Sequence, residues 1–359
     1  VYEKISLSAL YERTGIQKQI FNTVYQLMAV KQQTPELLQQ AKTLLMLPDY
    51  FGFRLTGNKL SEYTNGSTTQ LVNPDTFQWD KELIRKLGYP EDIFLPLQMP
   101  GTKVGQLLPE IQKEVGFDLE VVLCGSHDTA SAVMAVPQTE GDGIYISSGT
   151  WSLMGIESLK PVITEDAAAA NFTNEGGYDH RFRFLKNIMG LWMIQSVRHE
   201  YNDAYSFAQL CNMAEESKEF PSRVDVNDQS FLSPDSMVEA IRQYCHKTGQ
   251  PVPESVGELT SVVYRSLAQS YGETVRGLEK IAGKTYDSIH IIGGGSNAAY
   301  LNQLTADATG KTVYAGPGEA TAIGNLLAQM IHAGDLADLK SARKCVRESF
   351  EIKTFAPAK

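Results

Sequence analysis

A unit of strand, glycine loop and helix occurs twice in succession near the carboxyl end of this chain, and it constrains the fold more than any other feature. In the first unit, a run at 288–292 typical of a buried strand precedes three glycines and a helical segment that continues through Ala306. In the second, residues 312–315 precede a Gly-Pro-Gly loop and a helical segment at 320–333. Successive units of this kind predict an α/β domain whose ligands bind at the carboxyl ends of its strands.

Length and charge narrow the class of protein. The 359 residues are 42% hydrophobic and 21% charged, which is typical of an enzyme with two domains. The 32 Lys and Arg residues are outnumbered by 42 Asp and Glu residues, so nucleic acid is not an expected partner. No stretch reaches the roughly 18 apolar residues of a membrane span, and no signal-peptide pattern opens the chain. We therefore expect no membrane partner and a cytoplasmic location.

Cysteines and histidines give no sign of a metal centre. The cysteines lie far apart and form no CxxC or CxxH spacing, and the six histidines do not cluster. Neither a disulfide framework nor a structural metal is therefore expected. The four cysteines are Cys124, Cys211, Cys245 and Cys345.

The first third of the chain has mostly helical patterns. Apolar residues at helical spacing predict a helix over 35–47 that ends at Pro48. A polar stretch after Gly57 predicts a loop over a surface or a cleft. Strand signals become frequent further along, and we expect two domains, at 1–136 and 137–359.

A carboxylate and a set of phosphate-binding groups follow one another in the middle of the chain. The segment Gly125-Ser126-His127-Asp128-Thr129 lies between a predicted strand at 119–123 and a predicted helix at 129–136. An aspartate here is commonly only a helix N-cap, and a histidine only a packed neighbour. Further along, Ser147-Ser148-Gly149-Thr150 forms the predicted tip of a hairpin, whose hydroxyls and amides suit phosphate oxygens. Together these groups are the minimum equipment of a kinase that acts on an alcohol.

Two glycine loops are candidates for a nucleotide site. Gly293, Gly294 and Gly295 precede Asn297 but lack the GxGxxG order of a dinucleotide site. With the loop at 316–318, they could form the floor and wall of a site for adenine and ribose. Tight packing of helix on strand would explain the same glycines equally well.

One apparent phosphate loop is better explained as a helix end. Residues 277–285 read GLEKIAGKT, with five residues rather than four before the Gly-Lys-Thr. This Gly-Lys-Thr closes a helix and precedes a strand, the reverse of a phosphate-binding loop. We expect Gly283 to be the C-cap of a long helix that begins at the capping box Ser255–Glu258.

Nine segments, taken in their order, resemble the FGGY carbohydrate kinases, and within that family those that act on L-rhamnulose. The resemblance covers essentially the whole chain. The segments are TGIQ (14–17), FNTVYQL (21–27), PDYF with RLTG (48–57), EYTNGSTTQL (62–71), GSHDTASAV (125–133), SSGTWSLMG (147–155), NFTNEGG (171–177), KNIMGLW (186–192), and GGGSN (293–297) with GPGEATAIGN (316–325).

The resemblance implies an actin-like, ribonuclease H-like α/β fold with two domains around a cleft. It implies that Asp128 is the general base and that His127 and Thr129 lie beside the sugar. Asn187 resembles a sugar contact, in a segment that we expect to be helical. Trp192 and Met193, in the same segment, are expected in the core.

The resemblance also implies a nucleotide site on the carboxyl-terminal domain. Thr150 would lie near the phosphates of ATP, and Gln195 would contact the nucleotide. The adenosine site would comprise Gly293, Gly294, Gly295 and Asn297. Mg²⁺ would accompany ATP, and the products would be L-rhamnulose 1-phosphate and ADP.

The chain departs from the family pattern at its start. The family normally begins with a strand and a glycine and hydroxyl turn, with an acidic residue, that binds the phosphates and the metal. No segment between Val1 and Pro137 resembles it. We therefore expect an incomplete first domain and a chain that is impaired in catalysis.

Two other functions remain open at the level of sequence. Another FGGY kinase could act on fuculose, xylulose or a related ketose. An actin-like nucleotide-binding protein could use the same fold without sugar kinase activity, although a base-like Asp128 argues against it.

Overall fold

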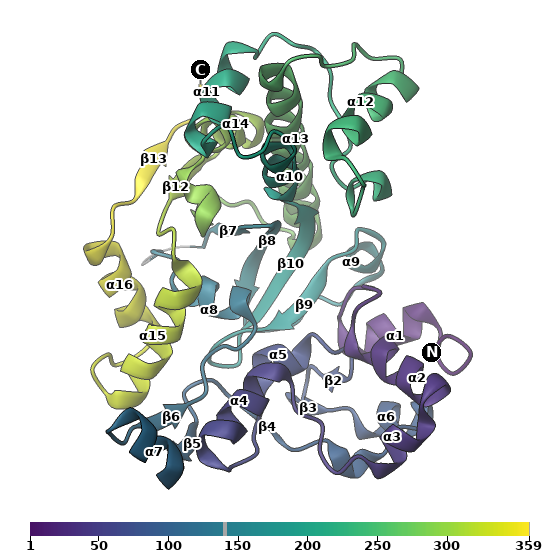
Figure 1. The fold of residues 1–359 in the computed structure, drawn as a ribbon, viewed down its shortest axis with the longest axis vertical. Coiled ribbons are helices and arrows are strands. Elements are labelled where there is room, and N and C mark those ends of the chain that lie inside the picture. The colour runs from purple at the N-terminus through teal and green to yellow at the C-terminus, as the bar shows by residue number, and fades with distance from the viewer. Residues whose placement is uncertain (139–141, 359) are drawn as a thin grey trace. The chain divides into compact units, whose positions relative to one another are not determined.

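The computed structural model describes residues 1–138 and 142–358, which form two compact units (Figure 1). Unit 1 comprises Val1–Ala135, Glu157–Leu185 and Thr321–Ala342. Unit 2 comprises Val136–Ile156, Lys186–Ala320 and Arg343–Lys359. Each unit is thus assembled from three stretches of the sequence.

Unit 1 is built mainly from short helices and two-stranded ribbons. The ribbons pair β1 with β4, β2 with β3, and β5 with β6. The elements are α1 (Leu7–Thr14), α2 (Thr23–Gln33), α3 (Pro35–Gln40), α4 (Leu47–Thr56), β1 (Ser61–Glu62), α5 (Tyr63–Ser67), β2 (Val72–Asn73), β3 (Gln78–Trp79), α6 (Lys81–Leu87), β4 (Leu97–Gln98), β5 (Lys103–Gln106), α7 (Pro109–Val115), β6 (Glu120–Val122), α8 (Asp128–Met134), α9 (Glu165–Ala169), β9 (Thr173–Gly176) and α15 (Ala320–Ala333).

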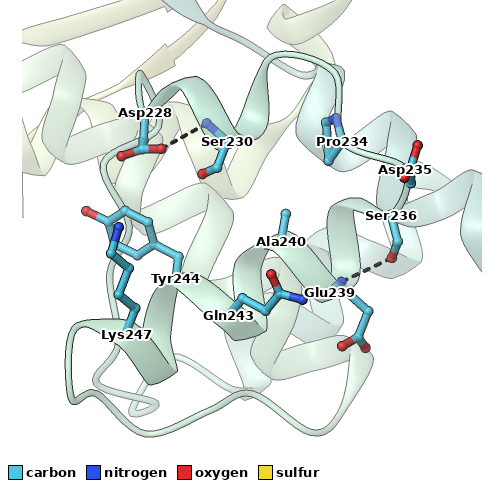
Figure 2. Close-up of a pocket in the computed structure, with 10 residues that line it drawn as sticks. All are labelled: Asp228, Ser230, Pro234, Asp235, Ser236, Glu239, Ala240, Gln243, Tyr244 and Lys247. Carbon is cyan, nitrogen blue, oxygen red and sulfur yellow. Dashed lines mark hydrogen bonds between the residues drawn. The ribbon is translucent and has the colours of Figure 1, made fainter.

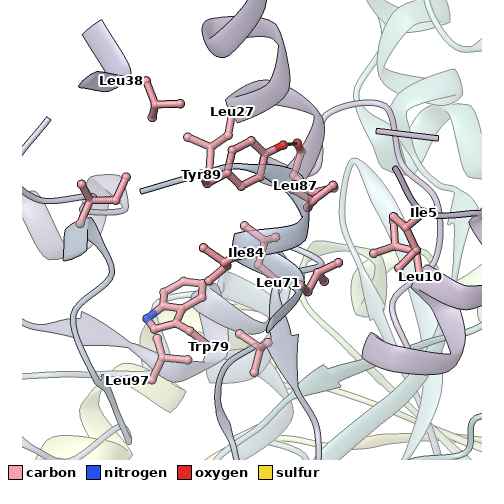
Figure 3. Close-up of a cluster of buried hydrophobic side chains, with 14 of the residues drawn as sticks. Ile5, Leu10, Leu27, Leu38, Leu71, Trp79, Ile84, Leu87, Tyr89 and Leu97 are labelled. Carbon is pink, nitrogen blue, oxygen red and sulfur yellow. Dashed lines mark hydrogen bonds between the residues drawn. The ribbon is translucent and has the colours of Figure 1, made fainter. Parts of the chain in front are cut away.

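A cluster of buried side chains holds the first part of unit 1 together (Figure 3). Leu10, Leu71 and Leu87 are fully excluded from solvent, and burial of a side chain of this size stabilises the fold by about 1.5–3 kcal/mol. Two of the polar aromatic side chains of the cluster donate hydrogen bonds to backbone carbonyls: Trp79 Nε1 to Leu95 O at 2.6 Å, and the Tyr89 hydroxyl to Val24 O at 2.7 Å. The short helices therefore pack on a shared core rather than on a large sheet.

Unit 2 is built around strands in the order β13-β12-β11-β7-β8-β10. The last of these, β10, begins in unit 1, where its residues 182–185 pair with β9. At the centre, the pairing is parallel: β11 pairs with both β7 and β12, and Ile289 lies opposite Ile144. Apolar strands of this kind are typical of a sheet covered on both faces. The elements are β7 (Ile144–Ser148), β8 (Trp151–Ser158), β10 (Phe182–Met189), α10 (Trp192–Glu200), α11 (Phe207–Glu216), α12 (Met237–Lys247), α13 (Val256–Ala282), β11 (Ser288–Ile292), α14 (Ala299–Thr309), β12 (Thr312–Ala315), α16 (Leu339–Ser349) and β13 (Lys353–Phe355).

Several local predictions are confirmed. In both units of strand, glycine loop and helix, the strand has the predicted bounds. The helix of the second unit, α15, has the predicted range. The predicted hairpin consists of the antiparallel strands β7 and β8. Helix α13 begins at a reciprocal capping box between Ser255 and Glu258 and ends at Gly283, which has a left-handed φ of 63°. The Gly-Lys-Thr is therefore a helix end, as predicted.

Two predictions for the first third of the chain are wrong. The predicted helix over 35–47 ends at Gln40, and Pro48 lies in the first turn of α4 instead of after a helix. A proline is tolerated there because the first backbone amides of a helix have no intrahelical acceptor. The polar stretch after Gly57 is no surface loop either: it contains β1 and the buried helix α5.

Among residues 1–138 and 142–358, no helix has both the length and the apolar composition needed to cross a membrane.

Candidate active site

The loop that carries Asp128 joins β6 to α8 in unit 1. Asp128 is the first residue of α8, and His127 occupies the N-cap position without a capping bond from its side chain. Among the described residues, the Asp128 carboxylate accepts hydrogen bonds only from the adjacent Thr129, from N at 2.7 Å and from Oγ1 at 3.2 Å. Its side chain is 77% exposed. The aspartate is therefore not a helix cap, and its second oxygen is accessible to a ligand.

The His127 ring lies between Asp128 and a pair of buried charges. Its Nε2 is 3.6 Å from Asp128 Oδ1, and its Nδ1 is 2.9 Å from Arg183 Nη2 and 3.3 Å from Glu175 Oε2. Burial lowers the pKa of His127; Glu175 opposes this shift and Arg183 reinforces it. The cationic form of the ring is therefore disfavoured.

Arg183 and Glu175 belong to the site, and sequence reasoning missed both. They are direct partners across the antiparallel pair of β10 and β9, with Arg183 Nη2 3.2 Å from Glu175 Oε2. Arg183 is fully buried, and its Nε also donates to Gly176 O at 3.0 Å. A buried guanidinium needs such a counter-charge. An arginine between Phe182 and Phe184 in an apolar strand was the available sequence signal.

Glu62 fixes the backbone in front of Asp128, and sequence reasoning gave it no role. Its carboxylate is fully buried and accepts hydrogen bonds from Ser126 N at 3.2 Å and Ser126 Oγ at 2.6 Å. It also accepts from Thr64 N and Oγ1, each at 2.6 Å. Burial raises the pKa of Glu62, and these hydrogen bonds oppose the shift. Glu62 thus ties α5 to the loop that carries the predicted base.

A second buried carboxyl group lies beside Glu62. Asp49 Oδ1 accepts a hydrogen bond from Glu62 N at 3.2 Å. Burial, and secondarily the charge of Glu62, raise the pKa of Asp49 to about 7. Two buried carboxyl groups so close together favour a protonated form of one of them.

The predicted nucleotide residues gather at one edge of the sheet in unit 2. The parallel strands β7 and β11 end together, with Ile292 opposite Ser147, so their following loops meet. Gly293 has a φ of 84°, and a Cβ atom there would lie 2.9 Å from Ser148 O. A Cβ atom on Gly295 would overlap the Ser148 side chain, whereas one on Gly294 would have open space. Close packing therefore accounts for Gly293 and Gly295, and only Gly294 presents free backbone.

The other predicted nucleotide contacts adjoin this edge. Thr150 O accepts from Trp192 N at 3.1 Å, which joins the hairpin tip to the start of α10. Gln195 lies in the first turns of that helix. The two glycine loops are joined by a bond from Gly293 N to Pro317 O at 3.0 Å. A Cβ atom on Gly318 would lie 3.5 Å from Asn297 Nδ2.

Asn187 lies on strand β10, not on the predicted helix, which begins only at Trp192. Its Oδ1 is buried and has no hydrogen-bond partner among the described residues. Such an oxygen can take a hydrogen bond from a ligand hydroxyl. Met193 is fully buried, as predicted for a core residue, whereas Trp192 is 37% exposed.

A pocket in unit 2 shares no residue with the predicted site. This pocket of about 450 Å³ lies between α12 and the loop that precedes it (Figure 2). Its lining includes Asp228, Asp235 and Glu239, with Tyr244 and Lys247 at one end. Within the described ranges 1–138 and 142–358, no group of three or more His, Cys, Asp or Glu side chains is arranged to hold a metal ion.

Comparison with known protein families accounts for both halves of the chain. Residues 1–135 match the amino-terminal domain of the FGGY family of carbohydrate kinases, and residues 144–333 match its carboxyl-terminal domain. The chain belongs to the FGGY family of carbohydrate kinases. ATP is accordingly the phosphoryl donor expected of an FGGY kinase, and the predicted enzyme class is confirmed.

Individual FGGY kinases are similar along the whole chain. A rhamnulokinase from Halalkalibacterium halodurans is 51% identical over 358 residues, which span 100% of this chain and 76% of that protein. A rhamnulokinase from Oceanobacillus iheyensis is 50% identical over 356 residues, which span 99% of this chain and 75% of that protein.

Solved structures of sugar kinases share the fold. The ligand-bound xylulose kinase from Lactobacillus acidophilus superposes with a TM-score of 0.76 at 16% identity, over 99% of this chain and 72% of that one. This similarity confirms the predicted two-domain α/β fold of the actin-like kinases.

Proposed function

We propose that this chain transfers the γ-phosphoryl group of ATP to O1 of L-rhamnulose, giving L-rhamnulose 1-phosphate and ADP. The observation that carries this proposal is the 51% identity to a rhamnulokinase along the full chain. The accessible Asp128 carboxylate at the start of α8 supplies the chemical group that the reaction needs.

Asp128 is the proposed general base. Its free oxygen accepts the proton of the primary hydroxyl on C1 of the sugar. At the same time, the oxygen of that hydroxyl, O1, attacks the γ-phosphorus in line. The bond between the γ-phosphorus and the β–γ bridging oxygen breaks, and ADP leaves. Proton acceptance by a positioned carboxylate contributes about 10²- to 10⁴-fold to such a step.

The sugar hydroxyls are the proposed source of specificity. In unit 1, His127 offers a ring nitrogen beside Asp128, and Thr129 is the next residue of the chain. In unit 2, Asn187 offers a buried Oδ1 atom without a partner among the described residues and is a separate proposed sugar contact. A site built from such groups rejects an analogue that lacks a hydroxyl, because its buried polar atoms are then left unpaired. Residues 1–136 would form the sugar side of the enzyme.

Residues 137–359 would form the nucleotide side. Thr150 and the open backbone of Gly294 face an edge where two parallel strands end, the usual position of a ligand in an α/β sheet. Gln195 and Asn297 lie on elements that adjoin this edge. Mg²⁺ would bind with ATP as part of the substrate, where it offsets the charge of the phosphate oxygens.

Other ketoses are less favoured as substrates. Relatives that are 40–51% identical over nearly the whole chain are rhamnulokinases. Four xylulose kinases among the similar solved structures are only 13–17% identical, so their similarity concerns the fold alone.

A ketose panel tests the proposal. Release of ADP from MgATP would be measured by a coupled assay with L-rhamnulose, L-fuculose and D-xylulose, and binding of each ketose by calorimetry. We expect L-rhamnulose to give the highest kcat/KM and the tightest binding. A preference for another ketose, release of ADP that no sugar stimulates, or the absence of both turnover and binding with L-rhamnulose would contradict the proposal.

A further inference from the structure

The contact between His127 and Arg183 defines which ring nitrogen carries the proton. His127 Nδ1 lies 2.9 Å from Arg183 Nη2, within hydrogen-bond distance. A guanidinium has only donors and stays charged in proteins. The Nδ1 atom must therefore accept, since a proton on it would point at the N–H of the arginine. The remaining ring proton then belongs to Nε2.

We infer that Arg183 is a positioning residue that holds His127 as the neutral tautomer with its proton on Nε2, on the side of Asp128. This inference deepens the proposed function and depends on it only for the role of Asp128. Neither Arg183 nor Glu175 touches the predicted base directly; both act through the ring.

Glu175 favours the other tautomer of His127, with its proton on Nδ1, so Glu175 and Arg183 compete. Its Oε2 lies 3.3 Å from the same Nδ1 and would accept a proton placed there. The arginine lies closer and in hydrogen-bond geometry, and it is held in place by Gly176 O and by its cross-strand partner. Burial adds to its effect, because a cationic ring next to a buried guanidinium is costly.

The tautomer matters because of what the ring presents to Asp128. The Nε2 atom lies 3.6 Å from Asp128 Oδ1. A neutral N–H at this position can orient the carboxylate or a sugar oxygen. An imidazolium would instead stabilise the charged carboxylate and weaken it as a base. Arg183 thus preserves the basicity of Asp128.

Nitrogen NMR of the protein labelled with ¹⁵N-histidine tests the tautomer directly, without substrate. The His127 signals are assigned by their loss in His127→Gln. We expect a pyridine-type resonance for Nδ1 and a pyrrole-type resonance for Nε2 at neutral pH. A pyrrole-type Nδ1, or a doubly protonated ring, would overturn the inference.

Variants separate Arg183 from its partner. In Arg183→Met, Glu175 is the remaining charged neighbour of Nδ1, so we expect the proton to move to Nδ1 or a second proton to bind. Arg183→Lys keeps a cationic donor and Glu175→Gln keeps the arginine, so both should retain the wild-type resonances. Arg13→Met is the matched control, because it removes an arginine from an ion pair with Asp80 elsewhere in unit 1. If Arg183→Met retains a pyridine-type Nδ1, Arg183 does not set the tautomer.

A second variant tests the tautomer of His127 if Arg183→Met fails to fold. If Arg183→Met does not fold, the double variant Arg183→Met with Glu175→Gln removes both buried charges together, which proteins tolerate better than the loss of one. We expect this variant to lose the single-tautomer pattern, and an unchanged pattern would count against the inference.

Kinetics normalised to the concentration of ATP-binding sites add a readout that loss of folded protein alone does not move. In the Arg183→Met protein, kcat per ATP-binding site should fall by about 10- to 100-fold, by analogy with the loss of a partner that orients a metal-bound histidine, while KM for ATP stays unchanged. The failures are distinguishable: a wrong tautomer with L-rhamnulose turnover refutes only this inference, and the expected tautomer without turnover refutes only the proposed function.

Discussion

Glu62 and Asp128 are two carboxylates at the loop between β6 and α8, and their environments are opposite. Glu62 is fully buried and accepts bonds from hydroxyls and backbone amides, so it organises the loop. Asp128 is exposed and, within the part of the chain that the structure describes, accepts hydrogen bonds only from Thr129, so it remains available to a ligand. Environment rather than residue type therefore separates a structural carboxylate from a chemical one.

Replacement of Asp128 by Asn tests the base. The amide keeps the size of the side chain but cannot accept the hydroxyl proton, so kcat with L-rhamnulose should fall by about 10²- to 10⁴-fold. The affinity for ATP should be retained, as measured by nucleotide titration. Asp118→Asn, another exposed aspartate of unit 1, is the control and should keep full activity. Normal turnover by Asp128→Asn would remove Asp128 from the mechanism.

Asp49 makes the stability of the fold depend on pH. Its pKa is about 7 in the folded protein and 3.8 as the reference value of an exposed aspartate. Because the folded pKa is raised, the stabilising contribution is complete below pH 4 and is lost as the pH rises to about 7. The free energy of unfolding should therefore fall by about 2–4 kcal/mol across this window on account of this group.

Asp49→Asn, which cannot ionise, isolates that contribution. Urea unfolding at several pH values should show a flatter profile for the variant than for the wild type between pH 4 and 7. At pH 8 the variant should be the more stable of the two. Parallel profiles would mean that Asp49 does not titrate in this range.

Helix α13 shows how an element can be specified by its ends. A reciprocal capping box satisfies its first amides, and Gly283 closes it with a left-handed φ. Each of these end signals acts on a residue no more than four positions away in the chain, so neighbours far away in sequence do not alter them. The core face of α13 then packs against α11 and α14.

Gly283 offers a test of this helix end. A Cβ atom at this position would meet nothing within 4 Å, so a substitution adds only backbone strain. Gly283→Ala should lower the free energy of unfolding by about 1 kcal/mol, as measured by urea denaturation. Gly283→Asn should cost less, because asparagine tolerates a left-handed φ better than alanine does. Equal losses for the two variants would contradict this explanation.

Helix α8 depends on a neighbour that is distant in sequence. A Cβ atom on Gly324 of α15 would overlap the carbonyl oxygen of Ser131 in α8. Glycine is therefore required for close approach at this point. The helix that begins with Asp128 is thus placed by a segment almost two hundred residues further along the chain.

At the scale of the whole molecule, unit 1 is assembled from separated stretches of chain. The loop after α1 bonds to β9 through Asn174 N to Gly15 O at 2.9 Å. Helix α5 bonds to the same strand through Gly176 N to Ser67 Oγ at 2.8 Å. The first 135 residues thus complete their hydrogen bonds only with the help of residues 157–185.

A fragment of residues 1–135 should consequently fail to fold alone. Unpaired buried polar groups and the missing strand β9 remove contacts that the fragment cannot replace. Circular dichroism with urea titration should show no cooperative unfolding transition, whereas the whole chain should show one. A cooperative transition in the fragment would mean that residues 1–135 are an independent folding unit.

The sequence by itself determined the features that depend on close neighbours along the chain. These are the strand, glycine loop and helix units, the hairpin of β7 and β8, and both ends of α13. Motifs in the right order also indicated the family, because each motif is a local pattern of residues.

The tertiary structure alone decided the features that depend on distant residues. Glu62 meets Ser126 across 64 positions, and Arg183 meets His127 across 56. Periodicity does not reveal such pairs. It also predicted a helix over 35–47, whereas the helix ends at Gln40 and Leu44 N donates to Ile93 O instead. The physical reason is that short-range patterns set the conformation of the backbone, whereas burial and charge pairing depend on which segments meet in the folded chain.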